Sequence, residues 1–133
     1  MAFESSAILD YSFVAAEDLS SYQYHFVVID SSGSVRLPDS ATENAVGVLQ
    51  NAPQSGEAAT VRILGISRVV ANAAIDEGVT VKAEYVGASD AGKATTSVGS
   101  RQYTAGVCVG ASAAEDDLCS VLLTPYAGIK DAA

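Results

Sequence analysis

The sequence predicts an all-β protein: a small sandwich or barrel-like domain built from two duplicated β modules, with an N-terminal arm. Short apolar segments recur about every ten residues with turn-forming residues between them, as in sandwiches and barrels. Landmark residues of the first half also return in the second half at a fixed spacing, which indicates an internal duplication. No segment keeps a helical period over three turns. The chain has 133 residues, 49% of them hydrophobic, which suits one domain with a real core.

The duplication is clearest at two pairs of glycines. Gly33 precedes Gly92 by 59 residues (92 − 33 = 59), and Gly47 precedes Gly106 by the same spacing (106 − 47 = 59). The spacing also aligns residues 15–18 with 74–77 and, after a one-residue insertion, 61–64 with 121–124. We therefore expect repeats over about 15–64 and 74–124, within a single β domain over 21–127.

Residues 1–20 differ in character from the rest of the chain. They carry five large apolar residues without a matching turn partner: Phe3, Ile8, Leu9, Tyr11 and Phe13. A terminus with this many large apolar residues is expected to pack against another surface. It is either a strand or short helix that caps the domain, or an extended arm that docks on a neighbouring molecule.

The first module is expected to begin with a strand from Tyr22 to Ile29, followed by a turn at 30–33 that Asp, Ser and Gly favour. Short strands follow at 35–37 and 45–50, with a loop at 51–56. A longer strand is expected over 59–70, and Gly65 within it is expected to mark a bulge.

The second module repeats this order. A turn at 76–78 precedes a strand at 79–86, and a turn at 88–92 leads into a short strand at 93–96. A strand at 103–109, an acidic loop at 111–117 and a closing strand at 118–124 complete the module. Pro125 is expected to end that strand, and residues 128–133 are expected to form a loose C-terminal tail.

Composition argues against several classes of partner. The net charge of −9 repels phosphate backbones and anionic lipids, so neither nucleic acid nor membrane binding is expected. The N-terminal residues lack the features of a signal peptide, and synthesis in a cytoplasm is the default. Cys108 and Cys119 lie on the two arms of one expected hairpin. They are best interpreted as small buried hydrophobes, with a cross-strand disulfide as the alternative.

Residues for chemistry are sparse. His25 has no nucleophile or carboxylate beside it and is interpreted as a half-buried strand residue whose counterpart at the same spacing is Glu84. The sequence contains no nucleophile elbow, phosphate-binding loop or calcium loop. We expect no catalytic, cofactor-binding or metal site, and we do not expect an enzyme.

Four segments of the second half carry a resemblance to a known family: residues 76–81, 91–96, 105–111 and 120–123. Their order of turn, strand, Gly-Lys-Ala-Thr turn, Ala-Gly-Val strand and Val-Leu strand resembles the capsid cement or head decoration proteins of tailed bacteriophages. The resemblance covers about residues 45–124. It implies a small β domain on the capsid exterior, bound to the major capsid protein, as a homo-oligomer with a trimer favoured.

The function expected from the sequence is that of a non-enzymatic virion protein that decorates and stabilises a bacteriophage capsid. Two alternatives remain: a tail or fibre component that contacts the host surface, and a small β-barrel that binds a ligand through His25, Arg62, Arg68 and tyrosines. Candidate contacts with the capsid or with other subunits are the apolar arm residues and two near the C-terminus: Phe3, Ile8, Leu9, Tyr11, Phe13, Tyr126 and Ile129.

Overall fold

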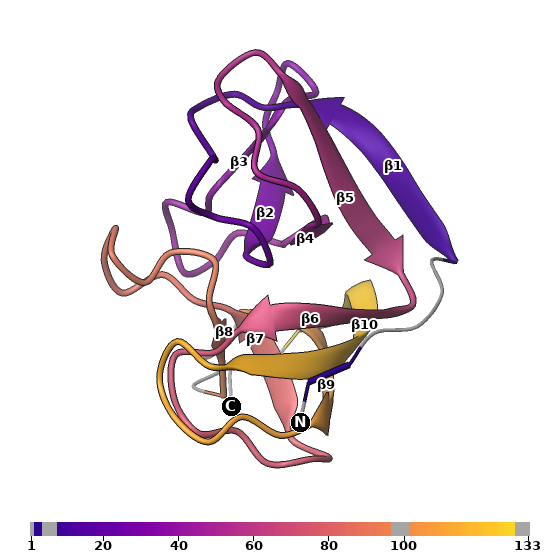
Figure 1. The fold of residues 1–133 in the computed structure, drawn as a ribbon, viewed down its shortest axis with the longest axis vertical. Helices are drawn as coiled ribbons and strands as arrows, with labels where there is room; N and C mark the ends of the chain where they lie inside the picture. The colour runs from indigo at the N-terminus through magenta and orange to yellow at the C-terminus, as the bar shows by residue number, and fades with distance from the viewer. Residues whose placement is uncertain (1, 4–7, 97–101, 130–133) are drawn as a thin grey trace.

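A computed structural model describes residues 2–3, 8–96 and 102–129, with only the backbone described for 125–129. The described residues form ten strands and no helix (Figure 1). The strands of the first module are β1 (Leu9–Val14), β2 (Phe26–Ile29), β3 (Val35–Arg36), β4 (Gly47–Leu49) and β5 (Ala58–Leu64). Those of the second are β6 (Ile66–Val70), β7 (Thr80–Ala83), β8 (Ala94–Thr95), β9 (Tyr103–Gly110) and β10 (Leu118–Ile129).

The two modules have the same topology. The first sheet has the order β1-β5-β4-β2-β3 and the second the order β6-β10-β9-β7-β8, with every neighbouring pair antiparallel. Each strand of the first sheet therefore has one counterpart in the second. The predicted all-β sandwich or barrel-like class is confirmed.

Each sheet curls until its two edges meet at one point. Ala15, directly after β1, forms a parallel bridge to Val35 in β3, and Ala71, directly after β6, forms the same bridge to Ala94 in β8. The bridging hydrogen bonds are also equivalent, because Ala16 N donates to the Val35 carbonyl and Asn72 N to the Ala94 carbonyl, at 2.8 and 2.9 Å. Ala15 and Ala71 are thus counterparts, whereas the constant spacing pairs Ala15 with Ala74.

The glycines that revealed the duplication hold equivalent positions. Gly33 and Gly92 adopt positive φ angles of 84° and 83° in the turns before β3 and β8. Gly47 and Gly106 lie where a side chain would overlap the neighbouring strand, against Val61 and Val121 respectively. These glycines are required by the backbone itself.

The structure corrects several expected elements. Residues 22–25 form turns rather than a strand, since Tyr24 has a positive φ of 66° and β2 begins only at Phe26. Gly65, with φ at 112°, marks no bulge but the point where the chain leaves the first sheet for the second. β10 continues past Pro125 to Ile129 after a register shift, so two residues of the tail at 128–133 pair with β9. Residues 130–133 lie outside the described residues.

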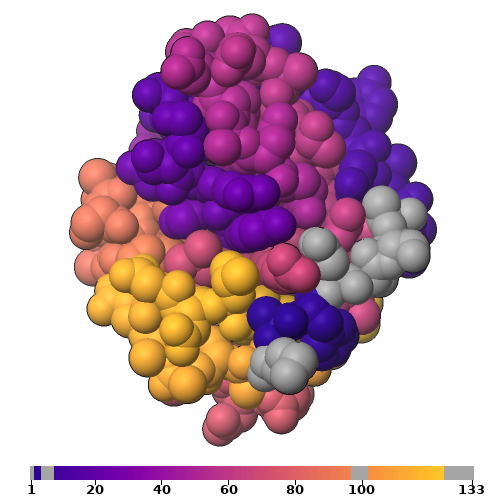
Figure 2. Space-filling view, viewed as in Figure 1, coloured from indigo at the N-terminus to yellow at the C-terminus, as the bar shows by residue number. Residues whose placement is uncertain are grey.

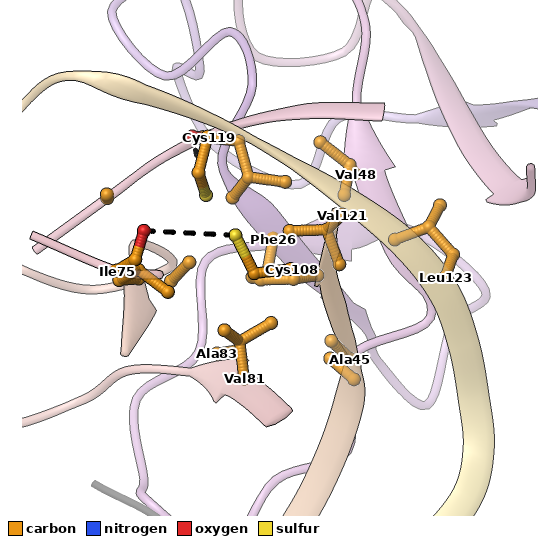
Figure 3. Packing of buried hydrophobic residues seen from close by; sticks show 14 residues of the cluster. Phe26, Ala45, Val48, Ile75, Val81, Ala83, Cys108, Cys119, Val121 and Leu123 are labelled. Carbon is orange, nitrogen blue, oxygen red and sulfur yellow. Dashed lines mark hydrogen bonds between the residues drawn. The ribbon is translucent and has the colours of Figure 1, made fainter. Parts of the chain in front are cut away.

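The hydrophobic core is divided unequally between the modules. The first module has a cluster around Leu19, Val27 and Leu49. The larger cluster contains residues of the second module together with Phe26, Ala45 and Val48 of the first (Figure 3). The two modules therefore share one apolar core across their junction.

Hydrogen bonds fix the junction as well. Phe26 N donates to the Gly92 carbonyl at 2.7 Å, and the Gln50 amide donates to Ser67 Oγ at 2.9 Å. Lys82, buried to 2% exposure, donates from Nζ to the Ala41 carbonyl at 3.1 Å. These hydrogen bonds are buried or partly buried, so they hold the modules in one arrangement.

Candidate interaction surface

The N-terminal segment contacts both modules. Phe3 is hydrogen bonded to β10, where its N–H donates to Ser120 Oγ and its carbonyl accepts from the same hydroxyl. Leu9–Val14 then forms β1 at the edge of the first sheet. In Figure 2, residues 2–3 lie on the yellow surface of β10. Of the two alternatives for the segment, the described part matches a strand that packs on its own domain.

An ion pair holds β1 onto β5. Asp10 is the cross-strand partner of Arg62, and Arg62 Nε donates to Asp10 Oδ1 at 2.9 Å. Arg62 is only 7% exposed, so its charge requires this partner. The pairing neutralises the only charged side chain of β1, whose sequence is Leu-Asp-Tyr-Ser-Phe-Val.

The outer edge of β1 is open along Leu9–Val14. Among the described strands β1 pairs with β5 alone. The counterpart edge, that of β6, is covered from within the chain, because Val70 N donates to the Tyr24 carbonyl at 2.9 Å. Val14 corresponds to Val70, since each precedes the bridging alanine, and it is 51% exposed. The first module thus lacks the cover that the second module receives.

Large apolar side chains surround this edge. We define the edge surface by five exposed residues on and beside β1: Ile8, Leu9, Tyr11, Val14 and Leu64. Ile8 and Tyr11 are 72% and 59% exposed, and Leu9 pairs with Leu64 across the strands. Natural edge strands are often protected by lysine, proline, a bulge or a cover. β1 contains neither lysine nor proline and no other described strand covers its outer edge, although its register on β5 shifts between Leu9 and Asp10.

The candidate contact residues fall into three groups. Ile8, Leu9 and Tyr11 belong to the edge surface, and Phe3 is exposed on the second module. Phe13 instead packs partly against the core of the first module, with its ring 5.2 Å from that of Tyr11. Tyr126 and Ile129 lie in β10, but their side chains are outside the described residues.

Sequence reasoning missed Val14 and Leu64. Val14 ends the apolar arm and Leu64 ends β5, and each looks like a core residue in an alternating strand. A signal was present in the arm, because Leu9, Tyr11 and Phe13 already fill one set of alternating positions, which leaves Val14 on the other.

His25 and the two cysteines, which the sequence offered for chemistry, are buried. His25 is 7% exposed, and burial lowers its pKa; it lies before β2, with Nδ1 3.3 Å from the Gln23 carbonyl, rather than in a strand. Cys108 and Cys119 are free thiols at 0% exposure, and burial raises the pKa of Cys119 to about 12. In the described part of the chain, no three His, Cys, Asp or Glu residues come together as a metal site requires. Nor does any helix there have the length and hydrophobicity to cross a membrane.

No protein-family model matches this chain, and no curated protein sequence matches it. A solved structure, described as that of the head fiber gp8.5 N base in bacteriophage phi29, is similar in fold with a TM-score of 0.65. The match covers 87% of this chain and 93% of the other at 14% sequence identity. The similarity extends over both modules, so the two-module arrangement itself is a known fold.

Proposed function

We propose that this chain is a non-enzymatic structural protein of a bacteriophage virion that decorates and stabilises the outer surface of the capsid. The observation that carries the proposal is the edge surface on a rigid two-module scaffold. The similarity in fold between this chain and the base of a phage head fiber supports a structural role in a virion. The proposal assigns no catalytic, cofactor or metal role.

The proposed attachment is strand addition. An extended segment of the major capsid protein would pair along the free edge of β1, where main-chain hydrogen bonds supply affinity and Leu9 and Tyr11 supply apolar contact. In this proposal the N-terminal segment stays on its own domain and accepts a strand, rather than docking on a neighbouring molecule as an extended arm. Because the chain carries a net charge of −9, the favoured partner surface is neutral or basic.

The same proposal includes a homo-oligomer, with a trimer favoured, on the capsid exterior. Copies at a threefold position of the lattice would each meet an equivalent set of capsid subunits. Sedimentation equilibrium of the purified chain tests this part, and a mass of one chain at all concentrations would contradict it.

Copy number in purified particles tests the main proposal. We expect a ratio to the major capsid protein near one to one, or a fixed simple fraction of it. A few copies per particle would instead favour the second candidate, a fibre or tail component, which the head-fiber neighbour also supports. Absence from particles would refute both.

Substitutions test the edge surface directly. Tyr11→Asp adds a charge on the exposed edge, while Ala74→Asp adds the same charge at an exposed loop residue of the second module that lies outside that surface. We expect Tyr11→Asp to weaken rebinding to particles depleted of the protein at least tenfold and Ala74→Asp to leave it unchanged. Equal binding by both variants, with unfolding curves like that of the unsubstituted chain, would refute attachment through β1.

A further inference from the structure

The duplicated modules differ most in the connection between their second and third strands. Asp30 N donates to the Ser34 carbonyl in the first module, and Glu84 N donates to the Lys93 carbonyl at the equivalent point of the second, both at 2.8 Å. The two bonded residues are four positions apart in the first module (34 − 30 = 4) and nine positions apart in the second (93 − 84 = 9). The five extra residues form the loop that projects beside the first module in Figure 1.

This loop builds one wall of a pocket at the module junction. The pocket has a volume of about 340 Å³. The second module contributes Tyr85, Ala88 and Ala91. The first module contributes a tyrosine, two apolar residues and four charged residues: Tyr22, Leu37, Pro38, Glu17, Asp18, Arg36 and Asp39. In Figure 2 the two modules meet along this side, with the β7–β8 segment against the first module.

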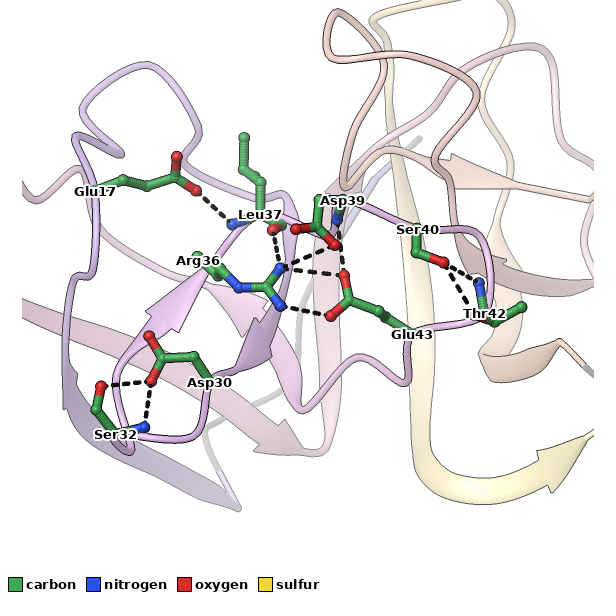
Figure 4. A network of polar contacts seen from close by, with 9 residues as sticks. All are labelled: Glu17, Asp30, Ser32, Arg36, Leu37, Asp39, Ser40, Thr42 and Glu43. Carbon is green, nitrogen blue, oxygen red and sulfur yellow. Dashed lines mark hydrogen bonds and ion pairs between the residues drawn. The ribbon is translucent and has the colours of Figure 1, made fainter.

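The positive charge that lines the pocket, on Arg36, is already paired with a carboxylate of the same chain (Figure 4). Arg36 donates from Nη1 and Nη2 to both carboxylate oxygens of Glu43, at 3.1 and 2.6 Å, and from Nη1 to the Leu37 carbonyl at 3.0 Å. This bidentate pair holds the pKa of Glu43 near 2. Arg36 therefore has little capacity left for an anionic ligand.

The negative groups keep free acceptor positions. Asp18 accepts hydrogen bonds from Ser20, with Ser20 N at 3.0 Å from Oδ1 and the Ser20 hydroxyl as a second donor, and Glu17 accepts one from Leu37 N at 2.9 Å through Oε2. The Asp39 side chain is 74% exposed, and its Oδ1 lies 3.6 Å from Arg36 Nη1, which is long for a hydrogen bond. Since a carboxylate accepts several hydrogen bonds, all three can bind a donor-rich group.

We propose that this pocket binds a basic side chain, arginine or lysine, presented by the protein that the chain decorates. The carboxylates supply charge-assisted hydrogen bonds, and Tyr22 and Tyr85 supply aromatic surface that attracts a cation. The identity of the partner rests on the proposed function, but the chemistry of the pocket does not. The contact would be a second one beside strand addition at β1.

Titration with small probes tests the chemistry. We would add N-acetylarginine amide, N-acetyllysine amide or N-acetylglutamine amide to the ¹⁵N-labelled full chain and follow amide shifts. The two cationic probes are expected to saturate shifts at the pocket residues, with binding at least fivefold tighter than that of the neutral probe and weakened by salt. N-acetylglucosamine is added in a fourth titration. A response to this sugar with none to the cations would indicate a carbohydrate site and overturn the proposal, and so would equal binding of the cationic and neutral probes.

Matched variants test whether the pocket contributes to binding of the chain to particles. Tyr85→Ala and Asp18→Asn remove one wall and one charge, and the Asn oxygen can still accept from Ser20. Val86→Ala in the same loop and Asp76→Asn on an exposed turn are the controls. We expect the pocket variants to reduce both probe binding and particle binding at least fivefold.

Failure here is distinguishable from failure of the proposed function. If the unsubstituted chain binds particles and the pocket variants bind equally well, the pocket proposal falls and the decoration role stands. If the unsubstituted chain does not bind particles, the decoration role falls, and the arginine and lysine titrations alone then decide for or against the pocket.

Discussion

Gly47 and Gly106 lie in close contact with the neighbouring strand, and replacing either of them by alanine is expected to destabilise the fold strongly. A Cβ at Gly47 would overlap the Arg62 carbonyl oxygen and lie 2.8 Å from Val61 Cγ1. A Cβ at Gly106 would overlap the Leu122 carbonyl oxygen and lie 2.6 Å from Val121 Cγ1. The obstacle is mainly backbone of the adjacent strand, which cannot withdraw without breaking the ladder between the strands.

The expected cost follows from this geometry. Overpacking of a core by a methyl group usually costs about 1–3 kcal/mol. Because a carbonyl of a paired strand is displaced, we expect Gly47→Ala and Gly106→Ala to cost about 3 kcal/mol or more each. Two controls separate the causes: Gly33→Ala, at φ 84° in open space, should cost roughly 1–2 kcal/mol, and Gly87→Ala, also in open space, less than about 0.5 kcal/mol.

Equilibrium urea unfolding at pH 7, followed by tyrosine fluorescence and far-ultraviolet circular dichroism, measures these four variants. The expected order of stability loss is Gly47→Ala and Gly106→Ala together, then Gly33→Ala, then Gly87→Ala. A loss below about 1 kcal/mol for Gly47→Ala would show that the ladder relaxes around a side chain, and the reasoning would be wrong. Unequal losses for Gly47→Ala and Gly106→Ala would contradict the structural equivalence of the two positions.

Three further predictions concern titratable groups. Because Arg36 lowers the pKa of Glu43 from 4.5 to about 2, its stabilisation is present above pH 4.5 and is lost as pH falls toward 2. Glu43→Gln should therefore lower stability at pH 7 by about 1–3 kcal/mol and flatten the stability profile between pH 5 and 2, and an unchanged acid slope would contradict the ion pair. Carboxylates raise the pKa of Lys93 from 10.5 to about 12, so its stabilisation is full below pH 10.5 and is lost toward pH 12. The stability difference between the unsubstituted chain and Lys93→Met should shrink over that range in urea titrations. Cys108 and Cys119 should react with Ellman's reagent at pH 8 only after unfolding, and rapid labelling of the native chain would refute their burial.

The sequence predicted those parts of the fold that depend on local backbone requirements. The glycine pairs marked real equivalences, because a left-handed turn and a close strand contact each demand glycine wherever the module is repeated. The constant spacing failed between β2 and β7, where the counterparts Val27 and Val81 are 54 residues apart (81 − 27 = 54), since the extra loop residues follow β7. The positive φ of Tyr24 shortened β2, and a tyrosine gives no sign in the sequence of a value that glycine, asparagine and aspartate adopt more often.

The candidate surface was predicted only in part. The apolar character of Ile8, Leu9 and Tyr11 is visible in the sequence, and their exposure is consistent with an interaction role. Which edge remains open depends instead on tertiary packing, because Tyr24 covers Val70 in the second module and nothing described covers Val14 in the first. The pocket at the module junction was not predicted either. The five extra loop residues that form one of its walls cannot be seen when the two halves are compared at one constant spacing.

The hydrogen bonds between Phe3 and Ser120 have a consequence for biosynthesis. The ribosome makes Ser120, the partner of Phe3, 117 residues after Phe3 itself. β10 is also the strand that joins β6 to β9, so the second sheet cannot form while β10 is inside the ribosomal tunnel. Until then the first module presents Phe26 and Val48 without the core that covers them. Prematurely terminated chains therefore remain open to proteases, and only chains that contain β10 reach the assembled state.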